Sequence, residues 1–132
     1  MGANGATVQP WNLGERSFAF SVLIIKLCRR LDQTPDVPRR LSGQLFDAGT
    51  SIGANVREGQ AGASRKDFIC KFRIALKEAR ETDYWLRLIV ATEILPAPEV
   101  AEMIREVGEL AKIIGRSIVT ARRNDPKPKR VR

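Results

Sequence analysis

The chain has 132 residues, a length that suits one domain and buries enough surface to fold without a disulfide or a structural metal. It contains no histidine, and the spacing of its two cysteines, Cys28 and Cys70, excludes a zinc site and a disulfide framework, which favours a cytoplasmic setting. The net charge of +8 is concentrated in residues 122–132, so a polyanionic partner is expected only if this tail takes part. The sequence has no secretory signal and no membrane-spanning apolar run.

The first half of the chain predicts an arm and two helices. Glycines and a proline make residues 1–14 a flexible arm. A helix is expected over residues 15–31, where apolar side chains recur at three- and four-residue spacing, namely Phe20, Leu23, Ile24, Leu27 and Leu31. Prolines at 35 and 38 end it. A second helix follows Pro38 and runs to about Glu58, where Gly59 and Gly62 break it; its apolar stripe is Leu41, Leu45, Ile52 and Val56.

The second half predicts two longer helices. Ser64 and Asp67 resemble a capping box that starts the third helix, and Pro96 and Pro98 end it. Its expected core face is Phe68, Phe72, Ala75, Ala79, Leu86 and Val90. The fourth helix is expected over residues 99–123, with the stripe Val100, Ile104, Val107, Ala111, Ile114 and Ile118. Prolines then leave a basic tail over residues 124–132.

Short connections between helices favour antiparallel neighbours. The fold class expected for residues 15–123 is therefore an all-α, antiparallel up-down-up-down four-helix bundle.

Two of the helices carry apolar residues away from the predicted core face. On the first helix these are Phe18, Val22 and Ile25; on the third they are Cys70, Ile74, Trp85 and Leu88. Trp85 is expected to lie opposite Phe72 and Leu86 and to point away from the core of the protomer. Scattered surface apolar residues are common and provide the plainer explanation. We expect instead that Phe18, Val22, Ile25, Ile74, Trp85 and Leu88 form a subunit interface.

Cations recur every seven residues on the third helix, at Lys66, Arg73, Arg80 and Arg87. A heptad repeat drifts by only about 20° per step on a helix, so these cations form one stripe. The fourth helix has a similar row of Arg105, Lys112, Arg116 and Arg123. One alternative is a solvated face whose charges pair with Glu78, Glu81, Glu106 and Glu109. The other is phosphate binding, for which the candidate residues are Lys66, Arg73, Arg80, Arg87, Arg116, Arg122 and Arg123.

The second helix also carries Gly43, Gly49 and Gly53 in its interior, which indicates close helix approach. Gln44, Ser51 and Asn55 lie along one side, where we expect hydrogen bonds at a packed or subunit contact. Asp83 falls towards the core side of the third helix and is expected to need a polar partner there.

The sequence lacks the usual components of an enzyme. There is no histidine to act as general base, no phosphate-binding glycine loop, and no Glu-x-x-His pair of a di-iron bundle. A ribonuclease built from lysine, arginine and glutamate alone is the remaining enzymatic alternative. We expect no catalytic residue, no metal, no cofactor and no small-molecule substrate.

The junction of the second and third helices carries a specific motif. Residues 51–59, Ser-Ile-Gly-Ala-Asn-Val-Arg-Glu-Gly, resemble the S-I-x-A-N-I-x-E-G signature of the 23S rRNA intervening-sequence proteins. The pattern continues through residues 64–69 and 75–86, and the resemblance covers about residues 15–123. Residues 85–88, Trp-Leu-Arg-Leu, are similar to a segment in the accessory proteins of diversity-generating retroelements. At residues 75–78 the sequence has Ala-Leu-Lys-Glu in place of the commoner A-x-G-S pattern, which leaves the subfamily of this chain open.

This resemblance implies a four-helix bundle that assembles into a homopentameric ring. Some members of the family are encoded within ribosomal RNA insertions. For the retroelement accessory proteins, which share the fold, the resemblance implies RNA and a reverse transcriptase as partners. The resemblance transfers no catalytic residues. Together with the cationic rows, it predicts a non-enzymatic accessory protein that binds RNA or DNA; an oligomeric protein scaffold without nucleic-acid binding is the alternative.

Overall fold

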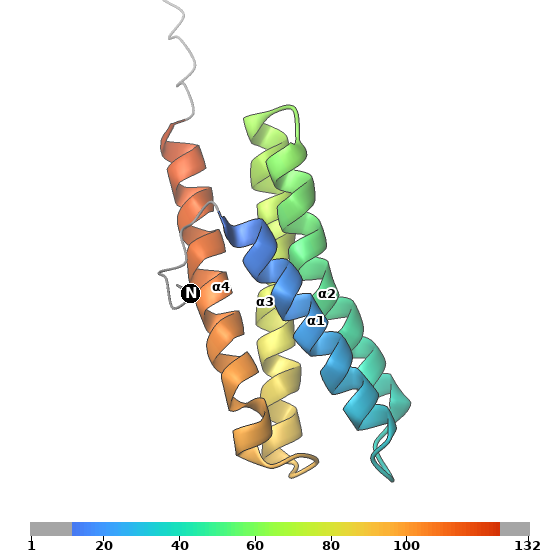
Figure 1. Cartoon of the computed structure of the whole chain (residues 1–132). Coiled ribbons are helices and arrows are strands. Elements are labelled where there is room, and N and C mark those ends of the chain that lie inside the picture. Colours follow the sequence, from blue (N-terminus) through green and yellow to red (C-terminus); the bar gives the residue numbers. More distant parts are fainter. Residues whose placement is uncertain (1–11, 125–132) are drawn as a thin grey trace, which may run out of the picture.

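The structure is a computed structural model that describes residues 12–124 as four helices (Figure 1). They are α1 (Leu13–Asp32), α2 (Arg39–Ala61), α3 (Arg65–Ala91) and α4 (Ala97–Arg123). Each helix packs against the next along the chain, and α4 returns to α1. No strand occurs between residues 12 and 124. The predicted all-α four-helix bundle is confirmed, whereas most of the predicted arm and tail lies outside the described residues.

Two helix ends differ from the sequence-based expectation. The first helix begins at Leu13, two residues before Glu15, because the side chain of Leu13 is buried and its carbonyl accepts a 2.7 Å hydrogen bond from the hydroxyl of Ser17. The second helix continues through Gly59 to Ala61. Gly59 does not break it, since this residue lies buried inside the helix against the ring of Phe72. Packing therefore outweighs the helix-breaking tendency of a single glycine.

The ends of α3 are set by local hydrogen bonds. At its start the hydroxyl of Ser64 accepts a 3.0 Å hydrogen bond from the amide of Asp67, as the capping motif predicts. At its end Glu93 adopts φ 59°, and the amides of Glu93 and Ile94 bond back to the carbonyls of Val90 and Ile89. This pair of bonds is a Schellman motif with a glutamate where glycine is usual. It ends α3 at Ala91, before the prolines, so Pro98 lies in the first turn of α4.

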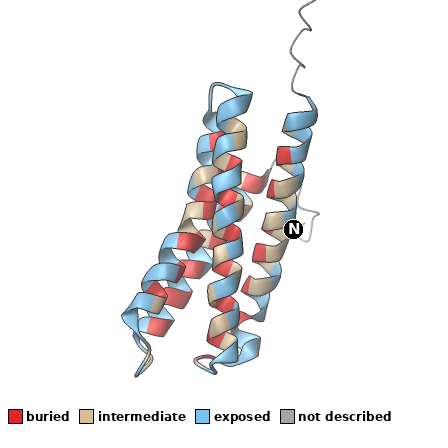
Figure 2. Cartoon of the chain, turned by 180° about the vertical axis from the view of Figure 1, so that it is seen from behind, coloured by how far each residue is buried: buried red, intermediate tan, exposed pale blue. Residues whose placement is uncertain are grey.

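One apolar core runs through the bundle and receives a stripe from every helix (Figure 2). Most of the predicted core residues are buried, but Leu23 is wrongly placed in that set because it is 39% exposed. The predicted stripes also missed Ile89, Met103 and Leu110, which are buried. The buried hydroxyls are satisfied: that of Ser42 donates to a carboxylate oxygen of Asp32 at 2.7 Å. No buried side-chain polar atom among the described residues lacks a partner.

Two of the three predicted glycines hold α1 close to α2. A Cβ on Gly49 would lie 2.7 Å from a side-chain carbon of Ile24, and one on Gly53 would lie 3.2 Å from the carbonyl oxygen of Ser17. Gly43 faces open space and has no such role.

Within the protomer, two of the predicted polar residues of α2 bond inside their own helix and not to a neighbouring helix; their predicted role at a subunit contact stays a prediction. Ser51 donates to the carbonyl of Asp47 at 2.6 Å, and Asn55 donates to that of Ser51 at 2.9 Å. The third residue of that predicted set, Gln44, is exposed.

Two ion pairs join α1 to α4. The guanidinium of Arg16 binds both carboxylate oxygens of Glu106, at 2.7 and 2.8 Å, with both side chains about one-fifth exposed. The hydrogen bond to Glu106 raises the pKa of Arg16 above its ordinary value. Nearer the other end, Arg30 pairs with Glu99 at 3.2 Å in a more exposed position. These pairs fix α1 across α4 where apolar contact is smaller than along α2.

Candidate nucleic-acid interface

The cationic row of α3 is divided by its pairing. Lys66, Arg73 and Arg80 are exposed, and no carboxylate of the described chain lies within ion-pair distance of them. In contrast, the Nε atom of Arg87 donates to both carboxylate oxygens of Asp83, at 2.9 and 3.1 Å. Asp83 is half-buried on the side of α3. Its partner is Arg87 of the same helix, and not a polar group in the core as expected.

The row on α4 is divided in the same way. Arg105 pairs with Glu102, whose hydrogen bond raises the pKa of Arg105, and Lys112 lies 3.4 Å from Glu109. Further along the helix Arg116, Arg122 and Arg123 are exposed and without an ion pair to a described residue. The pairing with carboxylates that the solvated-face alternative expects is thus found for Arg105 and Lys112 only.

The antiparallel packing of α3 and α4 brings the cation-rich halves of the two helices together. We call residues 65–80 of α3 and 112–123 of α4 the basic end; these segments hold ten cations and two carboxylates. Residues 81–91 and 97–111 form the acidic end, with two cations and six carboxylates. The candidate residue Arg87 lies at the acidic end and is separated from the other six. The pair of helices α3 and α4 is therefore electrostatically polarised along its length.

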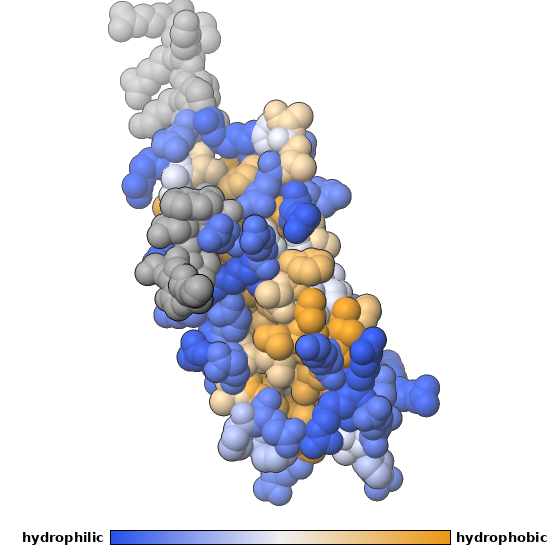
Figure 3. Space-filling view, in the orientation of Figure 1, coloured by the Kyte–Doolittle hydropathy of each residue, from blue (hydrophilic) through white to orange (hydrophobic). Residues whose placement is uncertain are grey.

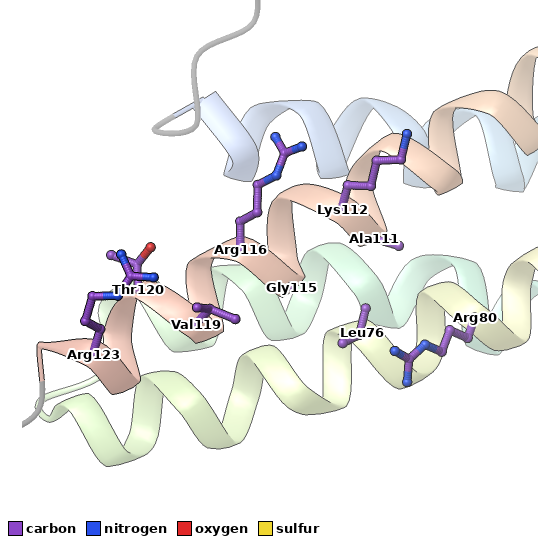
Figure 4. A pocket seen from close by; sticks show the side chains of 9 residues that line it. All are labelled: Leu76, Arg80, Ala111, Lys112, Gly115, Arg116, Val119, Thr120 and Arg123. Atoms are coloured by element: carbon purple, nitrogen blue, oxygen red, sulfur yellow. The ribbon is translucent and has the colours of Figure 1, made fainter.

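A groove of about 680 Å³ runs between α3 and α4 at the basic end (Figure 4). Its floor is apolar or small: Leu76, Ala111, Gly115 and Val119. Its rim is cationic, with Arg80 from α3 and Lys112, Arg116 and Arg123 from α4. Figure 4 shows Leu76 and Val119 over the floor and the charged side chains extending outward from its edges. We call it the α3–α4 groove. Three of the predicted phosphate-binding residues meet here, and Lys112, which the prediction had left out, joins them.

The other α3 cations line a second hollow. Lys66 and Arg73 surround a depression of about 540 Å³ together with Arg65, Ile69, Cys70 and Ile74. Arg122 is exposed near the end of α4. The basic end therefore offers these two cationic surfaces: the α3–α4 groove, which draws on both helices, and the hollow on α3.

The predicted interface residues do not form one exposed face. Phe18 is 60% exposed, and Val22 and Ile74 are exposed, while Ile25 and Leu88 are half-buried. Trp85 is also half-buried and packs against the core, with its indole N–H donating to Glu81 at 3.3 Å. The expectation that Trp85 points away from the core is therefore wrong. Trp85 lies on the side of α3, between the buried face and the exposed face, where part of its side chain reaches the core.

The outer side of α1 and α2 is the more apolar candidate interface. Phe18 and Ile25 line a groove of about 670 Å³ with Phe46, which is 43% exposed and was not predicted. The guanidinium of Arg57 lies 6.0 Å from the ring centre of Phe18. Figure 3 views the bundle from the side of α1 and shows apolar side chains over the middle of this face and charged ones at its ends. Such a patch is typical of protein contacts.

The described residues contain no group of three His, Cys, Asp or Glu side chains that could hold a metal ion. None of the described helices is long and apolar enough to cross a bilayer.

Residues 11–116 match the family described as 23S rRNA-intervening sequence protein. The chain belongs to this family. The match covers the bundle from the start of α1 to Arg116, and therefore includes most of the α3–α4 groove. The resemblance drawn from residues 51–59 is thereby confirmed.

A solved structure from the same family supports the assignment. It is the crystal structure of a protein of unknown function from the S23 ribosomal protein family of Bacteroides thetaiotaomicron. It shares 37% identity with this chain, covers 80% of it and is itself covered to 97%, with a TM-score of 0.75. Comparison with functionally curated proteins gave no match.

Proposed function

We propose that this family member is a non-enzymatic, homo-oligomeric accessory protein that binds nucleic acid, RNA in particular, through the basic end of its bundle. The observation that carries the proposal is the excess of cations from α3 and α4 at one end of the bundle, while carboxylates neutralise Arg87 and Arg105 at the other. Among the cations of the basic end, Arg73, Arg80 and Arg116 are exposed and have no ion pair to a described residue. Unpaired exposed cations bind phosphates at little desolvation cost. The family description, which refers to ribosomal RNA, supports RNA over DNA.

Recognition of this kind reads the backbone more than the bases. The α3–α4 groove and the neighbouring hollow present guanidinium and ammonium groups, and their linings contain no aromatic ring. Arginine and lysine contacts to phosphate position a nucleic acid without specifying its sequence. The proposed activity is therefore strongly salt-dependent and only weakly sequence-specific.

The test is a salt titration of the purified full chain with a labelled RNA, followed by fluorescence anisotropy. Log affinity is expected to fall linearly with log salt, by about 0.9 per phosphate contact on a duplex and about 0.7 on a single strand. Absence of salt-sensitive binding would favour the other candidate function, an oligomeric scaffold that binds protein only.

Assembly is the second part of the proposal, with a pentamer as the proposed state. It is supported by the exposed apolar side chains of Phe18 and Phe46, which a lone protomer leaves in water. A ring built from different patches on each side of the protomer would repeat the basic end once per subunit and multiply its field. Sedimentation of a Phe18→Glu variant is expected to shift towards monomer. A variant with Ala101→Glu, at an exposed position on α4, should leave the sedimentation profile unchanged.

We propose two alternative genomic settings for this protein. A reverse transcriptase is the proposed protein partner if the gene lies beside a retroelement; an insertion in ribosomal RNA is the other setting. Co-purification of the full chain with a neighbouring reverse transcriptase distinguishes the two.

A further inference from the structure

The α3–α4 groove has a floor that phosphate binding does not explain. Val119 is 53% exposed although it is a large aliphatic side chain, and Leu76, Ala111 and Gly115 continue the apolar surface beside it. Cations stand on both edges of this strip. A surface that served only to attract phosphates would gain nothing from an apolar floor, whereas covering Val119 removes apolar area from water.

We infer that this groove binds an unpaired segment of a nucleic-acid strand, with its phosphates on the cationic rim and its sugars and bases against the apolar floor. The inference rests on the proposed function and names the ligand of its site. It is carried by charge complementarity on two edges combined with an apolar strip between them.

A duplex fits this arrangement poorly. Its bases are stacked inside and its surface is lined by phosphates, so docking it on the groove would leave the floor uncovered or facing charge. A single strand can turn its bases and sugars to one side and its phosphates to another, and proteins recognise it in this way. The two-sided rim matches such a strand.

The dimensions agree with a short segment. From Ala111 to Arg123 the groove follows α4 for about 18 Å at 1.5 Å per residue, which corresponds to about five stacked nucleotides at 3.4 Å each. Because the floor is aliphatic and not aromatic, the bases pack on it without ring stacking, and the preference for single strands is expected to be modest.

Two glycines of α4 provide a matched experiment. Gly115 lines the groove, and Gly108 lies one heptad earlier outside it; a Cβ at either position meets nothing within 4 Å. Gly115→Leu therefore fills the groove without changing its charge, while Gly108→Leu makes the same change elsewhere on the same helix. Both variants should keep the helicity of the parent, since leucine is the better helix former.

The measurement is anisotropy of the full chain with an unstructured twelve-nucleotide RNA (about twice the groove length) and with the corresponding RNA duplex, at one salt concentration. The parent is expected to bind the single strand about fivefold more tightly than the duplex, on the scale of covering about half of one aliphatic side chain. Gly115→Leu should remove this preference, and Gly108→Leu should retain it. Val119→Asn, at an exposed position that folding does not need, gives the same readout if Gly115→Leu is unstable.

Four results would overturn the inference. Equal affinity of the parent for both RNAs, or Gly115→Leu and Val119→Asn behaving like the parent, would show that the floor takes no part, while the proposed function would stand. Equal weakening of single-strand and duplex binding by Gly115→Leu would show that the groove does not distinguish a single strand from a duplex. No salt-sensitive binding of either RNA would remove the proposed function and the inference together.

Discussion

Five helical glycines of this chain differ in what an added Cβ would meet. Gly49 admits the side chain of Ile24, and Gly59 admits the ring of Phe72, at distances that no Cβ would tolerate. Gly43, Gly108 and Gly115 face open space. All five lie inside helices of the structure, and only the packing of neighbouring helices separates those that are required from those that are not.

This difference gives a first prediction. Gly49→Ala should destabilise the protein by about 1–3 kcal/mol, because the added methyl group overpacks the contact with Ile24. Gly43→Ala should stabilise it by up to about 1 kcal/mol, through helix propensity alone. Urea unfolding of both variants measures the two effects. Equal changes in the two variants would mean that α1 and α2 do not pack closely at Gly49.

The two cysteines give a second prediction. Cys28 is buried, and burial raises the pKa of its thiol to about 11, with the charge of Asp32 contributing. Its folded-state pKa lies above the ordinary value, so the thiol stabilises the folded chain below pH 9 and loses that contribution as the pH rises towards 11. Cys70 is exposed.

At pH 8 iodoacetamide should therefore alkylate Cys70 and leave Cys28 unmodified until the protein unfolds. Mass spectrometry of the modified peptides resolves the two sites. Rapid modification of Cys28 under native conditions would contradict the packing of α1 on α2.

At the level of helices, the sequence predicted the number, order and approximate length of the elements because apolar periodicity is a local signal. The sequence-based prediction was wrong where contacts between helices determine where a helix ends or whether a side chain is buried. Gly59 continues α2 because Phe72 covers it, and Leu23 remains exposed because it lies on the side of α1 that turns towards α4, where the helices are joined by ion pairs. The flank position of Trp85 was missed for the same reason: its exposure depends on what packs beside α3.

The ion pairs between α1 and α4 give a third prediction. Replacing Arg16 or Glu106 by alanine should each cost about 1.5–3 kcal/mol, because the remaining charge loses two hydrogen bonds in a partly buried site. The same substitutions in Arg30 and Glu99, whose side chains are 51% and 41% exposed, should cost about 0–1 kcal/mol. Double-mutant cycles on both pairs measure the coupling. Equal coupling in the two pairs would contradict the stronger role of the Arg16 pair.

At the scale of the whole molecule, the organising feature is the division of α3 and α4 into a basic and an acidic end. Both cationic rows were visible in the sequence, but each looked continuous along its helix. In the structure, carboxylates pair with Arg87 and Arg105 and thereby divide each row. The antiparallel packing of the two helices places Arg80, Arg116 and Arg123 around one groove. The apolar floor could not be predicted, because Leu76 and Val119 come from helices whose register only the folded chain fixes.

The most direct test compares two charge reversals that change the net charge equally. Arg80→Glu with Arg116→Glu alters the basic end, and Arg87→Glu with Arg105→Glu alters the acidic end; each variant changes one arginine on α3 and one on α4. The measured quantity is the slope of log RNA affinity against log salt. The basic-end variant should bind more weakly and lose about 0.7–0.9 of slope for each phosphate contact removed, while the acidic-end variant keeps the parental slope. Equal loss in both variants, or no loss in the first, would contradict the assignment of nucleic-acid binding to the basic end.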